Sequence, residues 1–94
     1  MKPLVFRVHA IQKMFERNIS TEDVHHTIEH GEIIREYLDD KPFPSRLVLA
    51  WQGKRPLHVV VADDDKGQTI VITAYEPDPF LWDSDFKRKN KYSP

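Results

Sequence analysis

The sequence contains no cysteine, and this excludes several kinds of site at once. Disulfide scaffolds, thiolate zinc sites, iron–sulfur clusters and cysteine nucleophiles all need that residue. Glycine is also scarce, since Gly31, Gly53 and Gly67 are the only three and lie far apart. The glycine-rich loops that cradle phosphates in nucleotide-binding folds are therefore excluded as well.

Long apolar runs and a dominant charge are missing too. No run approaches the roughly 20 apolar residues that span a bilayer, and the N-terminus lacks the pattern of a signal peptide. The sequence therefore predicts a cytoplasmic protein that does not contact membranes. The formal net charge is only −1, so no overall field attracts nucleic acid. Binding to nucleic acid would need a local basic patch.

The residues that are present suit one domain over residues 1–94, with residues 79–94 as a C-terminal extension. The chain has 94 residues, of which 39% are hydrophobic, and this is enough for one core. We expect at least Trp82 to pack back on the domain or on a second copy, because an indole loses free energy in water. Lys87 to Lys91 would then project as a basic strip, and the acids before Trp82 could pair with it within one chain or across a homodimer.

Two helices are predicted near the N-terminus. Residues 9–17 carry apolar side chains at helical spacing, all expected in the core: Ala10, Ile11, Met14 and Phe15. A second helix should begin after Ser20, which forms a near capping box with Asp23. Gly31 is its natural left-handed stop.

From Glu32 onward the apolar period changes to two, which indicates strands. They are expected at residues 4–8, 32–38, 46–51, 57–62 and 69–75. Short turns between the last four imply an antiparallel meander. The predicted fold is α+β: two N-terminal helices packed on a twisted antiparallel sheet of about four strands, plus a short N-terminal edge strand. A functional site should lie on the other face of the sheet or at its rim.

Two residues in the predicted strands could carry chemistry. His58 lies in an apolar strand and is either a structural histidine or a general acid/base with a tuned pKa. Tyr75 is either a rim aromatic or a phenol that orients a substrate or stacks on a base. If Ala62 pairs with Gln68, His58 lies opposite Ile72 and the two side chains point apart. A slip of one residue puts His58 on the face of Tyr75.

A basic stripe is predicted on the first helix. His9, Lys13 and Arg17 follow the i, i+4, i+8 spacing of one helix face. The stripe is either an ordinary solvated face or a place for a phosphate.

The other polar side chains are weaker candidates for a functional site. His26 and His30 have the spacing of two helical metal ligands, but no third ligand is placed, so no metal site and no cofactor are predicted. In the strand over 32–38, Ile34 and Glu36 alternate with Arg35 and Tyr37. A partly buried Glu36 would be a general base or one half of an ion pair.

The sequence resembles a small bacterial family of uncharacterised domains. The resemblance covers positions 9 to about 88 and is most specific in the runs Pro56–Val60 and Thr73–Pro77, with support from His9-Ala10 and Ile19-Ser20. Genes of that family often lie beside a gene for a YgiT-type zinc-finger antitoxin. The resemblance further implies a distant relation to the RelE/ParE and BrnT-like toxins, which have the same order of elements.

RelE-type toxins cleave mRNA, so the resemblance implies a metal-independent endoribonuclease of a toxin–antitoxin pair. The positions carried over from the family are His9, Arg17, His58 and Tyr75. Lys13 and Arg17, with Lys87 and Arg88, would neutralise RNA phosphates. The implied partners are a zinc-finger antitoxin and mRNA.

The alternative function is a non-catalytic module that docks a protein partner through Phe80–Phe86. In this segment aromatic residues stand among prolines and acids, a composition that suits a protein interface better than RNA.

Overall fold

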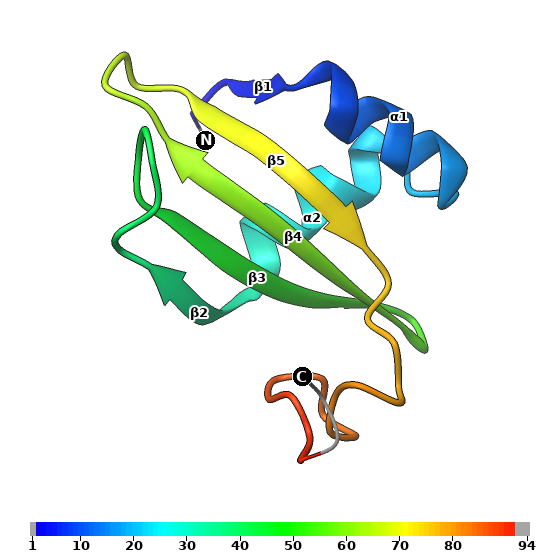
Figure 1. Ribbon diagram of the computed structural model, residues 1–94. Helices are drawn as coiled ribbons and strands as arrows, with labels where there is room; N and C mark the ends of the chain where they lie inside the picture. The colour runs from blue at the N-terminus through cyan, green and yellow to red at the C-terminus, as the bar shows by residue number, and fades with distance from the viewer. Residues whose placement is uncertain (1, 92–94) are drawn as a thin grey trace.

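The computed structural model describes residues 2–91. The elements follow in the order β1 (Leu4–Phe6), α1 (Val8–Glu16), α2 (Thr21–His30), β2 (Glu32–Tyr37), β3 (Ser45–Gln52), β4 (Arg55–Asp63) and β5 (Thr69–Tyr75). The five strands form one sheet in the order β1-β5-β4-β3-β2 (Figure 1). Strands β2 to β5 are an antiparallel meander, and β1 joins β5 in parallel. The predicted α+β class is confirmed, with a mixed sheet.

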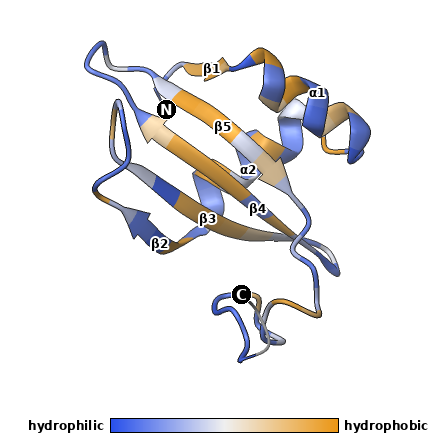
Figure 2. Ribbon diagram, in the orientation of Figure 1, coloured by the Kyte–Doolittle hydropathy of each residue, from blue (hydrophilic) through white to orange (hydrophobic). Residues whose placement is uncertain are grey.

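Both helices cover the same face of the sheet, and α2 crosses behind β3 and β4 in Figure 1. The core between the helices and the sheet consists of Ala10, Met14, Ile19, Val24, Val48, Leu57, Val59, Val61, Val71 and Ala74. In Figure 2 the apolar colour follows the central strands, as this burial requires. We call the face away from the helices the open face. No helix within residues 2–91 is long and apolar enough to cross a membrane.

Helix α1 packs through a narrower face than predicted. Ala10 and Met14 are buried, but Ile11 is 50% exposed and Phe15 is 88% exposed. The expectation that Ile11 and Phe15 join the core is therefore wrong. The helix is turned so that the side carrying Arg17 meets the sheet, and this guanidinium donates to a carbonyl of β5. Val8, expected in the first strand, already belongs to the helix.

Helix α2 begins as predicted. The Ser20 hydroxyl accepts from the Asp23 N–H, and the Asp23 carboxylate accepts from the Ser20 N–H, both at 3.0 Å. The helix ends at Gly31, but the φ of this residue is −81°, so the expected left-handed stop is wrong. Glycine is needed there for space instead. A Cβ would lie 2.7 Å from the Leu49 carbonyl oxygen and still closer to that of Thr27.

A β-bulge between Val60 and Val61 sets the register of the last hairpin. Ala62 pairs with Ile70, and His58 lies directly opposite Tyr75. Residues directly opposite in an antiparallel pair point to the same face. Both side chains therefore lie on the open face, since Leu57 and Val59 occupy the helix side. The pairing of Ala62 with Gln68 is therefore wrong, and a slip of one residue does not reach Ile70 either, but the placement of His58 on the face of Tyr75 that the slip implied is confirmed.

The C-terminal segment, residues 79–91, folds back over the open face. It is closed by its own backbone hydrogen bonds, from Asp83 to Arg88 and from Asn90 to Leu81. Trp82 is 6% exposed, so the expectation that it packs on the domain is confirmed. The remaining residues of the predicted extension, 92–94, lie outside the described part of the chain.

The expected basic strip does not simply project into water. The Lys87 ammonium is 3.0 Å from the Glu32 carboxylate. The Lys89 ammonium lies 6.0 Å from the centre of the Trp82 ring. The prediction that Lys87 and Lys89 project into water as part of a basic strip is therefore wrong, because each lies close to a group of the folded chain.

Candidate functional site

His58 is fully buried although it lies on the open face, because the C-terminal segment covers it. Its Nδ1 is 3.3 Å from the Tyr75 hydroxyl, and its Nε2 is 2.8 Å from the carbonyl oxygen of Phe86. A carbonyl oxygen can only accept a hydrogen bond, so Nε2 carries the hydrogen. In the neutral ring Nδ1 is then the acceptor for the Tyr75 hydroxyl.

This environment holds His58 in its neutral form. Burial lowers the pKa of His58 below 6.5, and the hydrogen bond to the Phe86 carbonyl opposes the shift only in part. Desolvation of the imidazolium is the physical cause. A neutral imidazole has one nitrogen lone pair, which is what a general base needs.

Tyr75 keeps its proton for similar reasons. Burial raises the pKa of its hydroxyl above 10.0, and Tyr37 acts in the same direction. The charges of Arg35 and Arg17 act against this shift. Two of these groups are also placed by contacts: Arg17 donates to the Ala74 carbonyl next to Tyr75, and Arg35 lies near the Trp82 ring that contacts His58.

Arg17 is held at the edge of the sheet beside Tyr75. Strand β1 pairs only with Thr69–Val71, so further along β5 the Ala74 carbonyl is not taken up by that strand. The Arg17 guanidinium donates to it at 2.8 Å. This bond places a positive charge one residue away from the candidate phenol.

Arg55 fixes the end of helix α1 that carries Arg17. Its guanidinium donates to the backbone carbonyls of Arg17 and Asn18, both at 3.0 Å. The same group donates to the Glu76 carboxylate at 2.7 Å, directly after Tyr75. Arg55 thus ties the start of β4 and the end of β5 to the helix end.

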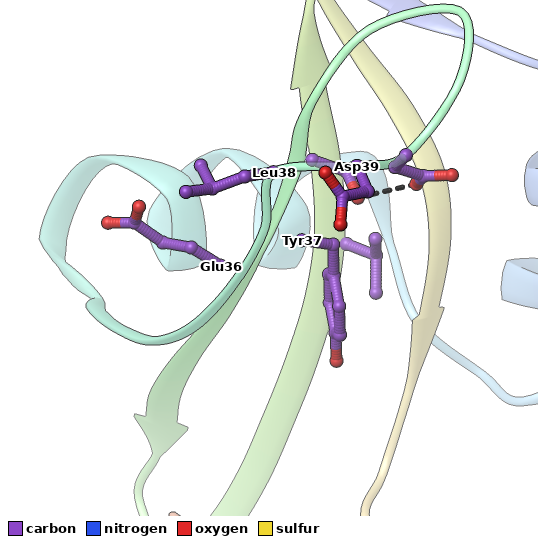
Figure 3. Close-up of a pocket in the computed structure, with 7 residues that line it drawn as sticks. Glu36, Tyr37, Leu38 and Asp39 are labelled. Carbon is purple, nitrogen blue, oxygen red and sulfur yellow. Dashed lines mark hydrogen bonds between the residues drawn. The ribbon is translucent and has the colours of Figure 1, made fainter.

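A shallow hollow of about 550 Å³ lies at the β2–β3 end of the open face (Figure 3). Its lining includes Tyr37, Val60 and Ser45, and the Ser45 hydroxyl donates to Asp40 at 2.6 Å. In Figure 3 the Tyr37 side chain points along the sheet toward the end where β5 finishes. The hollow and the His58–Tyr75 pair thus lie on the same face of the sheet, and Val60 of its lining is two residues from His58 along β4.

The structure brings together three of the four positions predicted as catalytic, namely His58, Tyr75 and Arg17. His9 is exposed on α1, two turns before Arg17 and so about 12 Å back along the helix. Sequence reasoning did not propose Arg35 and Tyr37 as site residues. Their alternation in one strand was visible, but the sequence did not reveal that this side faces His58.

The predicted RNA-binding cations are more scattered. Lys13 pairs with Glu16 at 3.4 Å, and Lys87 pairs with Glu32. Arg88 is exposed on the C-terminal segment. Of that set, only Arg17 lies beside the buried pair.

Two other polar features lie away from the His58–Tyr75 pair. Glu36 lines the hollow but is exposed, so the expectation of a partly buried carboxylate is wrong. The rings of His26 and His30 are 5.0 Å apart on α2. Over residues 2–91, no group of three or more His, Cys, Asp or Glu side chains is arranged to hold a metal ion.

The fold and the site define an α+β domain in which a buried histidine is hydrogen-bonded to a half-buried tyrosine on the face of the sheet opposite the helices. Residues 6–76 match the family described as "Domain of unknown function (DUF4258)". The match covers well over half of the chain, so the protein belongs to this family. No curated protein and no solved structure matches it. The match includes His58 and Tyr75 and ends before the C-terminal segment that covers them.

Proposed function

We propose that the protein is a metal-independent endoribonuclease that acts on mRNA, the toxin of a bacterial toxin–antitoxin pair. The supporting observation is the neutral His58, hydrogen-bonded to Tyr75, with Arg17 bonded to the Ala74 carbonyl and Arg35 near the Trp82 ring that contacts His58. Cleavage of RNA at a 2′-hydroxyl needs a base, an acid and cations near the phosphorus. These side chains supply all three without a metal.

The chemistry follows from the two nitrogens of His58. When Nε2 is released from the Phe86 carbonyl, Nδ1–H can donate to the Tyr75 oxygen, and this leaves the Nε2 lone pair as the base. Nε2 takes the proton of the 2′-hydroxyl, and the 2′-oxygen bonds to phosphorus while the bond to the 5′-oxygen breaks. The Tyr75 hydroxyl gives its proton to the 5′-oxygen and regains one from Nδ1. The products are a 2′,3′-cyclic phosphate and a 5′-hydroxyl.

Arg17 and Arg35 have the electrostatic role in this reaction. Negative charge builds up on the phosphoryl oxygens as the 2′-oxygen attacks, and positioned cations stabilise it. Arg17 is already positioned by its bond to the Ala74 carbonyl. Arg35 lies on the opposite side of the pair, on β2.

Induced expression in a bacterial host tests this proposal. We expect wild type to stop growth and to leave mRNA fragments that end in 2′,3′-cyclic phosphate, also with purified protein in EDTA. His58→Ala should abolish both effects. His25→Ala is the matched control, because this exposed histidine lies on α2, and it should behave as wild type. Normal growth and intact mRNA with wild type and with Trp82→Ala would refute the proposal.

A non-catalytic docking module is the second candidate, and one observation favours it. Phe80 is 83% exposed in the C-terminal segment, while Trp82 and Phe86 are turned toward the sheet. A partner would then meet Phe80 rather than the whole stretch Phe80–Phe86. Binding of the product of the neighbouring gene to wild type but not to Phe80→Ala, with RNA intact in every variant, would favour this function.

A further inference from the structure

We propose that the C-terminal segment occupies a nucleobase site beside His58, with the Trp82 indole in the place of the base. The inference rests on the proposed endoribonuclease function, because it names the part of the RNA that the site takes and what must leave first. Four observations carry it: the surroundings of the indole, the hydrogen bond to His58, the attachment of the segment and the shape of the open face.

Trp82 meets two kinds of group that also hold bases in proteins, the His58 ring in an edge-to-face contact and a nearby arginine. Its ring centre is 4.5 Å from that of His58, with the planes at 86°. The Arg35 guanidinium carbon is 5.9 Å from the ring centre. Aromatic rings and arginine planes are the usual surfaces against which unpaired bases pack. An indole is a flat bicyclic ring similar in size to a purine, so a base fits where the indole lies.

The segment also holds His58 in the tautomer that cannot act as the base. The Phe86 carbonyl accepts from Nε2 at 2.8 Å, so Nε2 keeps its hydrogen and cannot take a proton. Phe86 has a φ of 59°, a left-handed conformation that is costly for a residue with a side chain. The segment is thus held in an unfavourable backbone conformation at the point where it blocks His58.

The attachment of the segment to the sheet is light apart from its aromatic side chains. The ion pair between Lys87 and Glu32 is exposed on both sides, and such pairs contribute little. Figure 2 shows the segment as largely hydrophilic. Its backbone bonds between Asp83 and Arg88 and between Asn90 and Leu81 lie within the segment, so it can lift as a unit. Displacing Trp82 and Phe86 is therefore the main requirement for opening.

The open face continues beyond the part that the segment covers. His58, Tyr75 and Arg35 line the covered part. Tyr37 and the hollow of about 550 Å³ lie on the same face, toward the β2–β3 loop. With one base in the place of Trp82, we expect the next nucleotide to follow the open face toward this hollow, whose lining is drawn in Figure 3.

Binding of an uncleavable RNA to the full chain tests the inference. The probe is a fluorescein-labelled, fully 2′-O-methylated single-stranded decamer, with an abasic decamer of equal charge as its control. Only chains in which the segment has lifted can bind RNA, so the apparent affinity is reduced by the fraction of chains that are open. Trp82→Ala raises this fraction and should bind the decamer about tenfold or more tightly than wild type. The abasic decamer should gain nothing. Phe80→Ala, in the same segment but 83% exposed, should match wild type.

A second measurement does not depend on the fold of Trp82→Ala. In Trp51→Phe, Trp82 is the only tryptophan, because the chain has two. Saturation with the methylated decamer should move its emission to longer wavelength and open it to quenching by acrylamide. A Trp82 that stays shielded in the bound chain overturns the inference, as does an equal gain for the abasic decamer, or a decamer that binds neither chain.

The two proposals can fail separately. The methylated decamer cannot be cleaved, so binding is measured without cleavage. If Trp82→Ala binds the decamer more tightly but not the abasic control, and the protein cuts no RNA, the proposed endoribonuclease activity is refuted and the base site stands. Cleavage by wild type, with no gain in Trp82→Ala, would keep the endoribonuclease and remove the role of the segment.

Discussion

Lowering the pH from about 7.5 to about 5.5 should destabilise the folded protein through His58. In the unfolded chain this histidine takes up a proton near pH 6.5, whereas burial keeps its pKa lower in the fold. Between these two values the unfolded state binds more protons, so the free energy of unfolding falls as the pH falls. The slope should approach about 1.4 kcal/mol per pH unit, the limit for one group. Above pH 6.5 the contribution of His58 is constant.

Two cations, Arg35 and Lys89, lie 5.9 and 6.0 Å from the centre of the Trp82 ring that contacts the imidazole, but desolvation is the cause of the lowered pKa of His58. Asp63 does not interfere in this range. Burial works against its ionisation, but hydrogen bonds from Thr69 and Arg46 outweigh this and lower its pKa below 3.8. The stability that Asp63 contributes is therefore lost only in stronger acid.

Urea unfolding followed by circular dichroism measures this effect. Wild type and His58→Gln are compared across the same pH series, and only wild type should lose stability between neutral pH and the lower end. The exposed histidines of α1 and α2 are common to both chains, so they cancel in the comparison. Equal slopes in the two chains, or a wild type that gains stability toward acid, would show that His58 is not held neutral by burial.

Three further substitutions test the packing by urea unfolding. Met14→Ala should cost about 2–5 kcal/mol, because the side chain is buried, whereas Phe15→Ala next to it should stay within about 0.5 kcal/mol. A cost above about 1 kcal/mol for Phe15 would contradict the orientation of α1. Gly31→Ala should cost about 1–3 kcal/mol, because its Cβ would press on the Leu49 carbonyl, and an unchanged midpoint would contradict this contact. Ser20→Ala should cost about 1 kcal/mol through the lost cap of α2, and no cost would mean that the cap does not hold the helix.

Local signals predicted most of the fold. The capping box at Ser20 and Asp23 placed the start of α2, and the change of period at Glu32 placed the start of β2. These signals depend on residues close in sequence, so a single chain reveals them. Local signals did not predict which face of α1 is buried. Ile11 and Phe15 have the same spacing as the buried pair, and only the contact of Arg17 with β5 decides which pair is buried.

The candidate site was predicted in its members but not in its arrangement. His58 and Tyr75 stand out by their neighbours in the sequence, yet their meeting depends on the bulge at Val60 and Val61. A bulge adds one residue to one strand without a fixed sequence signature. The cover of His58 by Phe86 was equally hidden, because it depends on a contact between residues 28 positions apart.

The position of β2 at the outer edge of the sheet has a consequence for how copies of the protein meet in concentrated solution. An unpaired strand edge can template pairing with another chain, which leads to aggregation. β2 carries charged side chains at Glu32, Arg35 and Glu36, and its register is broken between Ile33 and Arg35. A second copy that approached this edge would meet charges and an interrupted ladder instead of a flat apolar strand. β2 therefore protects the sheet from growing by edge-to-edge addition, even though Ile33 is exposed on it.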